Sequence, residues 1–147
     1  MKLMIINPDW GMTKEQMDVR CRILSEYAGP DVEISMECLT KTRVNLNSMV
    51  DIVLAGPEIL EMTASAEQRG YDAVILYCFS DPVMEACRQM VSIPVVGAGQ
   101  AACLMLPLVG YHGAVLVADE GRIPEKKVSI GRTGLSPERI CGYEAVR

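Results

Sequence analysis

Apolar residues recur along this chain with two different spacings, and the alternation of these spacings predicts the order of its elements. Apolar runs and apolar–polar alternation predict strands at residues 2–6, 32–38, 72–77, 94–97 and 114–118. Apolar residues at helical spacing predict helices at residues 13–28, 48–69, 83–90 and 100–109. Strands that alternate with helices indicate an α/β fold with a parallel sheet and right-handed crossovers.

Local signals refine this pattern. Thr13 and Gln16 have the spacing of a capping box, so the first helix should begin there. In the second helix Gly56 is followed by Pro57, and because proline removes a backbone hydrogen bond we expect a break at this point. The segment at residues 32–38 has one polar face, which places it near an edge of the sheet.

The tail of the chain carries weaker signals than the rest. Residues 119–125 are predicted to form a charged loop, residues 125–134 a weak helix and residues 139–146 a strand. A chain that stops just after a strand leaves sheet surface uncovered, so we expect this last unit to be incomplete.

Composition excludes several classes of protein. Half of the 147 residues are hydrophobic, and a net charge of −5 without a basic cluster argues against a nucleic-acid surface. One Trp and one Phe are too few for a base-stacking platform. No charged residue lies between Arg88 and Asp119, but Pro and Gly interrupt this stretch repeatedly, so we expect buried elements and no membrane span.

The cysteine pattern indicates free thiols in a reducing, cytoplasmic setting. The six cysteines lie at positions 21, 38, 78, 87, 103 and 141, without a CxxC pair. The single histidine, His112, cannot complete a zinc site, so no metal is expected. Gly97-Ala-Gly99 lacks the third glycine and the lysine of a phosphate loop and predicts close packing, and Lys126-Lys127 predicts a solvated pair.

Cys78 is the main candidate for chemistry. It follows the apolar run at residues 72–77, at the carboxyl end of a predicted buried strand, where ligands of open α/β sheets bind. Asp81 is predicted to be the N-cap of the next helix and Pro82 its first residue, and a helix N-terminus favours a thiolate. Cys78 is therefore predicted to be a nucleophile or a base, with a small buried hydrophobe as the alternative.

Three ordered segments of the chain resemble the aspartate/glutamate/hydantoin racemase family. They are residues 5–8 (Ile-Ile-Asn-Pro) with Met12-Thr13, residues 72–82, which end in Cys-Phe-Ser-Asp-Pro, and residues 93–97 (Ile-Pro-Val-Val-Gly) with Ala101-Ala102. The Cys-Phe-x-Asp-Pro motif is similar to that of the hydantoin and allantoin racemase branch. The resemblance runs through nearly the whole chain.

The resemblance implies two similar, flavodoxin-like α/β lobes with the substrate between them. In such enzymes a cysteine thiolate from one lobe removes the proton on the chiral carbon, and a thiol from the other lobe returns a proton to the opposite face. No cofactor is needed, because the carbonyl of the substrate accepts the developing charge. The implied partner is a small carbon acid, an amino acid or a hydantoin-like molecule, and Cys78 corresponds to the first thiolate.

The same resemblance implies roles for five substrate-binding residues. Backbone N–H groups of Phe79 and Ser80 would face an oxygen of the substrate, where they would stabilise an enolate-like state. Asn7 and Pro8 would shape the opposite wall. Asn45 falls where the hydantoin branch usually carries a serine that meets the substrate.

The chain departs from the family pattern at four places. The departures are Asp9-Trp10-Gly11 after Asn-Pro, Asn45-Leu46-Asn47 in the second loop, Gln100 in place of a glutamate, and Val117-Ala118 in place of a threonine pair. Hydroxyl groups that would bind the substrate are replaced at these places. The departures therefore leave the substrate open.

Family members are longer than the 147 residues of this chain, and their second cysteine lies in the additional part. We expect residues 1–110 to form the first lobe and residues 111–147 the start of a second, incomplete lobe. Cys141 lies on a predicted strand rather than after it, so it is not expected to substitute. Two explanations stay open: the chain is a fragment or a shortened gene product of a racemase, or it forms the expected homo-oligomer, in which two Cys78 thiols that meet across a twofold axis would complete the site.

Three functions stay open from the sequence. The first is a cofactor-independent racemase or epimerase, an isomerase in which a cysteine thiolate takes a proton next to a carbonyl. The second is an enzyme of the maleate isomerase or malonate decarboxylase type, which are relatives of the same fold. The third is a binding module on this scaffold without turnover.

Overall fold

A computed structural model describes residues 1–146, and Arg147, the last residue of the predicted second lobe, lies outside this range. The strands are β1 (Lys2–Trp10), β2 (Glu33–Leu39), β3 (Ala73–Leu76), β4 (Val95–Gly97), β5 (Gly113–Val117) and β6 (Ile140–Ala145). The helices are α1 (Lys14–Ala28), α2 (Met49–Gln68), α3 (Met84–Met90), α4 (Ala98–Val109) and α5 (Ile123–Arg132), with 3-10 turns η1 (Glu120–Arg122) and η2 (Pro137–Arg139). The predicted α/β alternation is confirmed.

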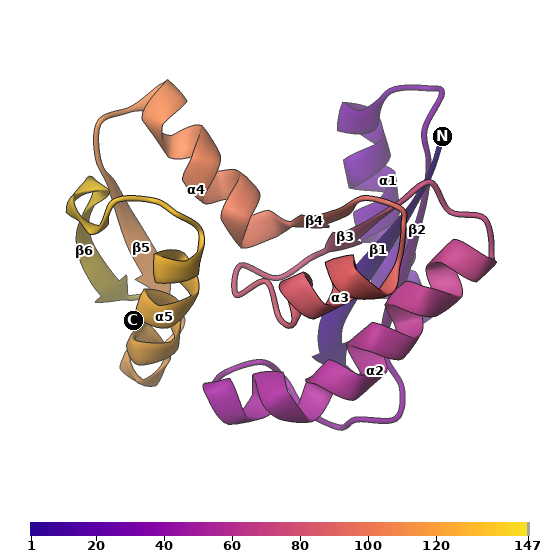
Figure 1. Ribbon diagram of the computed structural model, residues 1–147, viewed down its shortest axis with the longest axis horizontal. Coiled ribbons are helices and arrows are strands. Elements are labelled where there is room, and N and C mark those ends of the chain that lie inside the picture. Colours follow the sequence, from indigo (N-terminus) through magenta and orange to yellow (C-terminus); the bar gives the residue numbers. More distant parts are fainter. Residues whose placement is uncertain (147) are drawn as a thin grey trace.

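A parallel four-stranded sheet forms the larger part of the molecule (Figure 1). Its strand order is β2-β1-β3-β4, which is typical of the doubly wound, flavodoxin-like class. Ile5 of β1 pairs with Met36 of β2 on one side and with Ile75 of β3 on the other. β2 therefore lies at an edge of the sheet, as its polar face predicted.

The main core lies between this sheet and α2 and α3. Alternate residues of the central strands point into it, as the two-residue period of a strand requires. Met4 and Ile6 of β1, Val74 and Leu76 of β3, and Ile59 of α2 are each no more than 1% exposed. The predicted capping box at the start of α1 is also present.

β5 and β6 pair in parallel as a separate two-stranded sheet, which lies with α5 at the left of Figure 1. Its small core consists of Cys103, Val115, Val117, Ile130 and Leu135. Cys103 belongs to α4, so the helix that follows the first sheet packs against the second. The boundary at residue 110 between two lobes stays a prediction.

Helix α2 corrects one expectation, because it continues through Gly56 and Pro57 without a break. Ala55 and Ile59 on either side are completely buried in the main core, and this burial outweighs the hydrogen bond that proline removes. A Cβ at Gly56 would lie 3.1 Å from Cγ1 of Val83, so the glycine allows close packing of α2 against the chain before α3.

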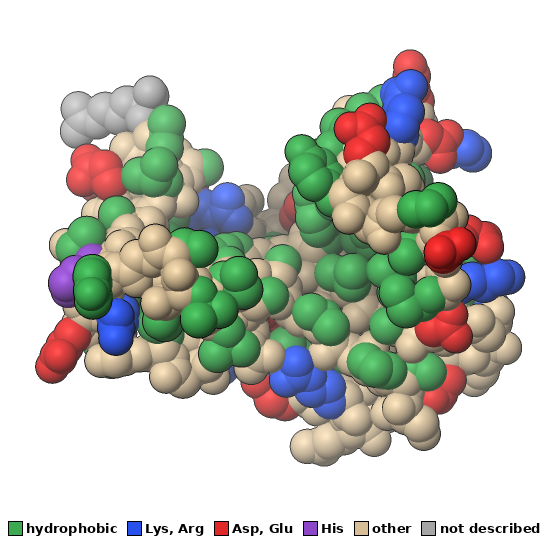
Figure 2. Space-filling model, turned by 90° about the horizontal axis from the view of Figure 1, so that it is seen from above, with side chains coloured by type: hydrophobic (Ala, Val, Ile, Leu, Met, Phe, Trp, Pro, Cys, Tyr) green, Lys and Arg blue, Asp and Glu red, His purple; other side chains and the backbone are tan. Residues whose placement is uncertain are grey.

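Seen from above, the two parts stand on either side of a depression, and hydrophobic side chains gather on its floor and flanks (Figure 2). Helix α4 contributes strongly to the exposed apolar surface, through Leu104, Met105, Leu108 and Val109. A homo-oligomer stays a prediction.

Candidate active site

Five of the predicted site residues meet where β3 ends beside β1. Ile6 of β1 pairs with Leu76 of β3, and the N–H of Tyr77 donates to the Ile6 carbonyl at 2.8 Å. β1 therefore continues through Asn7 and Pro8 directly beside the segment that carries Cys78, Phe79 and Ser80. Parallel strands place these ends together, which is where the sheet rule expects a ligand.

β1 does not end at residue 6 as predicted but extends to Trp10, with an irregularity in its pairing after Asn7. Asn7 and Pro8 are consequently buried within the strand rather than in a loop. The extension continues because the loop after β2 supplies new partners. The N–H of Trp10 donates to the Val44 carbonyl at 3.0 Å, and the N–H of Leu46 donates to Asp9 Oδ1 at 2.9 Å.

These contacts place Asn45 beside the end of β1, next to the other predicted site residues. With its amide nitrogen turned toward the backbone, Asn45 Nδ2 donates to the carbonyl oxygens of Trp10 and Val44, each at 3.3 Å. The amide nitrogen thus holds the loop, and the amide oxygen is left for other partners.

Asp81 caps a different helix from the one predicted. Its carboxylate accepts the N–H groups of Gly99 at 2.8 Å and Gln100 at 2.5 Å, at the start of α4. Helix α3 begins only at Met84, after Asp81 and Val83 with φ of 45° and 49°. The prediction of Asp81 and Pro82 as the start of a helix is therefore wrong, because a partner distant in sequence takes the carboxylate.

The close packing predicted for Gly97 and Gly99 is confirmed. A Cβ at Gly99 would lie 2.0 Å from the carbonyl oxygen of Phe79, and one at Gly97 would lie 2.4 Å from Cγ of Asp81. Both approaches are impossible for a side chain. The two glycines therefore let the Cys78 loop lie directly against the start of α4.

Cys78 is half-buried, and burial raises its pKa above the ordinary value of a thiol. The backbone and side chain of Ser80, as hydrogen-bond donors to sulfur, and the charge of Lys126 act in the opposite direction, and Asp9 adds to the increase. The sequence predicted a thiolate beside a helix N-terminus. The structure corrects this, because no helix begins directly after Cys78 and burial decides the direction.

Two residues that the sequence did not single out reach the Cys78 loop from α5. Lys126 was predicted to be solvated, but it is 6% exposed, and its Nζ donates to Ser80 Oγ. Glu125 is also buried and lies 2.9 Å from Lys126 Nζ in an ion pair. The one usable signal was the spacing of Glu125 and Ser129, which share a helix face.

The geometry is that of an α/β strand-end site in which a thiol, two backbone turns and a buried cation converge. The family model of Asp/Glu/hydantoin racemases matches residues 5–144. The chain belongs to this family.

The relatives show how much of a family member this chain represents. The hydantoin racemase of Rhizobium meliloti is 25% identical over 124 residues, which are 84% of this chain and 51% of that relative. The allantoin racemase from Klebsiella pneumoniae has a TM-score of 0.87 at 21% identity over 98% of this chain and 58% of its own. The chain spans about half the length of the curated relatives it matches.

A more distant structure shares the fold. The maleate isomerase of Pseudomonas putida S16, crystallised with maleate, has a TM-score of 0.69 at 11% identity over 98% of this chain and 62% of its own. At such identities the likeness shows the fold alone. Residues 1–146 contain no group of three His, Cys, Asp or Glu side chains that could hold a metal ion, and no helix among them has the length and hydrophobicity to cross a membrane.

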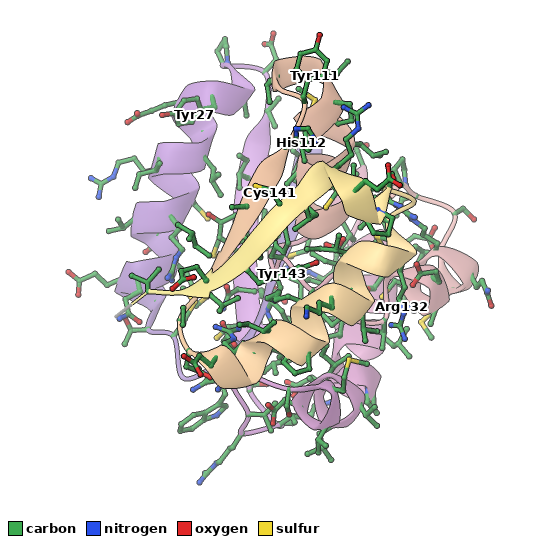
Figure 3. The ribbon with its side chains drawn as sticks, turned by 90° about the vertical axis from the view of Figure 1, so that its left-hand side faces the viewer. Tyr27, Tyr111, His112, Arg132, Cys141 and Tyr143 are labelled. Carbon is green, nitrogen blue, oxygen red and sulfur yellow. The ribbon has the colours of Figure 1, made fainter. Side chains whose placement is uncertain are left out.

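Three other cysteines of this racemase-family chain lie in a hydrophobic core or at the surface. Cys87 belongs to the main core and Cys103 to the core of the small sheet, and burial raises the pKa of both thiols. Cys141 is exposed on β6, and its Sγ lies 3.3 Å from the Gly113 carbonyl oxygen. Figure 3, viewed from the side of the small sheet, places Cys141 in front, on the outer strand.

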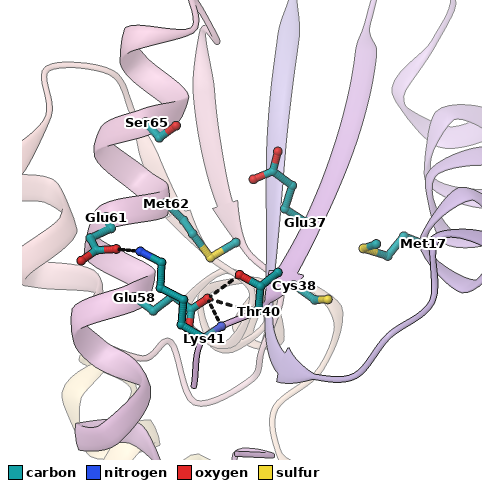
Figure 4. Close-up of a pocket in the computed structure, with 9 residues that line it drawn as sticks. All are labelled: Met17, Glu37, Cys38, Thr40, Lys41, Glu58, Glu61, Met62 and Ser65. Atoms are coloured by element: carbon teal, nitrogen blue, oxygen red, sulfur yellow. Dashed lines mark hydrogen bonds and ion pairs between the residues drawn. The ribbon is translucent and has the colours of Figure 1, made fainter. Parts of the chain in front are cut away.

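A hollow of about 330 Å³ opens at the β2 edge of the sheet (Figure 4). The carboxylate of Glu58 lies in it and accepts the N–H groups of Thr40 at 2.7 Å, Lys41 at 2.9 Å and Thr42 at 2.7 Å. Burial raises the pKa of Glu58, but these three donors outweigh it and lower the pKa to about 2. None of the predicted site residues lines this hollow, so we assign it to the structure of the loop.

Proposed function

We propose that this chain carries the proton-abstracting side of a carbon-acid racemase or epimerase, with Cys78 as the base. The observation that carries the proposal is the convergence of Asn7, Pro8, Cys78 and Ser80 where the paired strands β1 and β3 end. Membership of the Asp/Glu/hydantoin racemase family and the hydantoin and allantoin racemase relatives support a hydantoin-like substrate.

The proposed step is a single proton transfer. The Cys78 thiolate takes the proton from a carbon next to a carbonyl and becomes a thiol, while the C–H electron pair moves onto the carbonyl oxygen as an enolate. Backbone N–H groups near the oxygen stabilise such a state. We assign the oxygen contact to the backbone N–H groups of Phe79 and Ser80, which follow Cys78 directly in the chain.

Racemisation also needs an acid on the opposite face of the substrate. Among the described cysteines, Cys87 and Cys103 lie within cores, Cys141 lies on the outer strand of the small sheet, Cys38 is buried on β2 and Cys21 lies on α1. We therefore propose that this chain by itself exchanges the substrate proton and inverts the centre only when another acid is brought to the site. A second copy of the chain is one source of such an acid.

The protonation state of Cys78 determines how the rate of α-proton exchange depends on pH. Because burial raises the pKa of Cys78, the resting protein holds a thiol at neutral pH. Only the thiolate can accept the proton, so the exchange rate should increase with pH through the range in which ordinary thiols titrate and continue to increase beyond it.

The test is exchange of the α-proton in D₂O, followed by NMR, with a 5-substituted hydantoin, allantoin and aspartate as separate substrates. We expect exchange with at least one of them, loss by about 100-fold or more in Cys78→Ala, and no loss in the matched variant Cys141→Ala. Equal exchange by Cys78→Ala would contradict the assignment. A folded protein that exchanges none of the substrates would favour the binding-module reading.

A further inference from the structure

A short series of polar groups connects α5, which lies beside the small sheet, with the loop after β3 that carries Cys78. Lys126 Nζ of α5 donates to Ser80 Oγ in the loop after β3. Ser80 follows Cys78 by two residues, and hydrogen bonding from Ser80 lowers the pKa of the Cys78 thiol against the larger effect of burial. Lys126 and Ser80 are only 6% and 8% exposed, so little water screens the charge on the ammonium group.

The ammonium group of Lys126 is held in place by its neighbours. Glu125 lies 2.9 Å from it, and Ser129 Oγ donates to the other carboxylate oxygen of Glu125 at 2.5 Å. The ring of Phe79 lies 5.8 Å from Lys126 Nζ, within reach of a cation–π contact. Burial of a flexible lysine in this way requires that its charge be paired, and Glu125 provides the pair.

A second basic residue of the same segment binds the loop after β2, which carries the predicted site residue Asn45. Arg122 of η1 donates from Nη2 to the carbonyl oxygen of Leu46 at 2.6 Å. Leu46 in turn donates its N–H to Asp9 at the end of β1. Two basic residues about one helical turn apart therefore contact both loops that carry predicted site residues.

We propose that Lys126 is a positioning residue for Cys78: held by Glu125, its ammonium group orients the Ser80 hydroxyl toward the sulfur and favours the thiolate over the thiol. The inference deepens the proposed function, but it rests on that function only for the use made of the thiolate. Two other carboxylates lie near the loop. Asp9 of β1 acts against the thiolate, and the carboxylate of Asp81 is directed toward the start of α4.

The test needs no substrate. The alkylation rate of Cys78 by iodoacetamide is measured against pH, peptide by peptide, in the wild type, in Lys126→Met and in the matched variant Lys127→Met. Lys127 is exposed beside Tyr143, so its variant loses the same charge from the adjacent position. We expect Lys126→Met to slow labelling of Cys78 by about three- to tenfold at pH 8, with its midpoint moved to higher pH, and Lys127→Met to match the wild type.

Two further variants control for misfolding and test whether Lys126 acts on Cys78 through Ser80. Lys126→Met leaves Glu125 buried without its cation, so the neutral pair Glu125→Gln with Lys126→Gln provides a second measurement and should slow labelling similarly. If Lys126 acts through Ser80, Lys126→Met should have little further effect in a Ser80→Ala background. Labelling of Cys78 in the folded Lys126 variants at the rate of Lys127→Met would overturn the inference.

The inference and the proposed function can fail separately. Slower labelling in Lys126→Met without α-proton exchange by the wild type would leave the inference standing and remove the racemase activity. Exchange by the wild type with labelling indifferent to Lys126 would keep the activity and overturn the inference.

Discussion

Glu58 and Glu125 are both buried glutamates, one in each part of the molecule, and their partners differ in kind. Glu58 is 5% exposed, and its partners are mainly three backbone N–H groups of the loop after β2, with the Thr40 hydroxyl as a fourth donor. Glu125 is 4% exposed and has side-chain partners, the ammonium group of Lys126 and the hydroxyl of Ser129. In both, burial alone would raise the pKa, and the partners lower it.

The kind of partner indicates a different role for each buried carboxylate. Backbone donors are fixed by the fold, so Glu58 ties a loop to α2 and does nothing beyond that tie. A side-chain cation has donors to spare, so Lys126 can satisfy Glu125 and also reach Ser80 beside Cys78. We therefore assign Glu58 to stability and Glu125 with Lys126 to the reactivity of the thiol.

The largest effect on stability should come from Glu58→Gln, at about 2–3 kcal/mol in urea unfolding at pH 7. The ordinary pKa of 4.5 falls to about 2 in the folded protein. Because the folded pKa is the lower one, the carboxylate stabilises fully above about pH 4.5, and this stabilisation is lost as the pH falls toward 2. The difference between wild type and variant should shrink over that range.

Glu61→Gln is the matched control for this prediction, because Glu61 lies on the same helix and pairs with Lys41 at the exposed surface. Its cost should stay below about 1 kcal/mol. A purely structural carboxylate at the edge of the sheet should leave the labelling rate of Cys78 unaltered. A change of that rate in Glu58→Gln would contradict the contrast between Glu58 and Glu125.

A smaller effect is expected from Ser129→Ala, which removes one of the two partners of Glu125. We expect a loss of about 1 kcal/mol, the net value of a buried hydrogen bond, with Lys126 still on Ser80 and labelling of Cys78 within about twofold of the wild type. Val128→Ala, at an exposed neighbouring position, is the reference. A loss in Ser129→Ala no larger than in Val128→Ala would show that the hydroxyl does not support the pair.

The sequence predicted most of what short-range patterns control. The strand and helix order, the capping box at Thr13 and the close packing at Gly97 and Gly99 depend on periodicity or on residue size, and all are present in the structure. The nearness of the Asn-Pro and Cys-Phe-Ser-Asp-Pro segments was implied by the family resemblance, and the pairing of β1 with β3 brings the two segments together.

Long-range contacts account for what the sequence could not predict. Asp81 caps a helix 18 residues further along the chain, and Lys126 bonds to a serine 46 residues earlier, so neither partner is visible in a local window. A Lys-Lys pair looks solvated in sequence because burial of one of the two depends on contact of α5 with the loop after β3. Pro57 was misjudged for a related reason, since tertiary packing outweighed its local cost.

The most direct test of the central claim is protection of Cys78 by a substrate. Iodoacetamide labelling of Cys78 and Cys141 is followed in the same sample, with and without increasing concentrations of a 5-substituted hydantoin. The account predicts that the hydantoin slows labelling of Cys78 in a saturable way and leaves that of exposed Cys141 unchanged. Labelling of Cys78 that stays at its free rate while the hydantoin demonstrably binds elsewhere on the protein would contradict Cys78 as the base of the site.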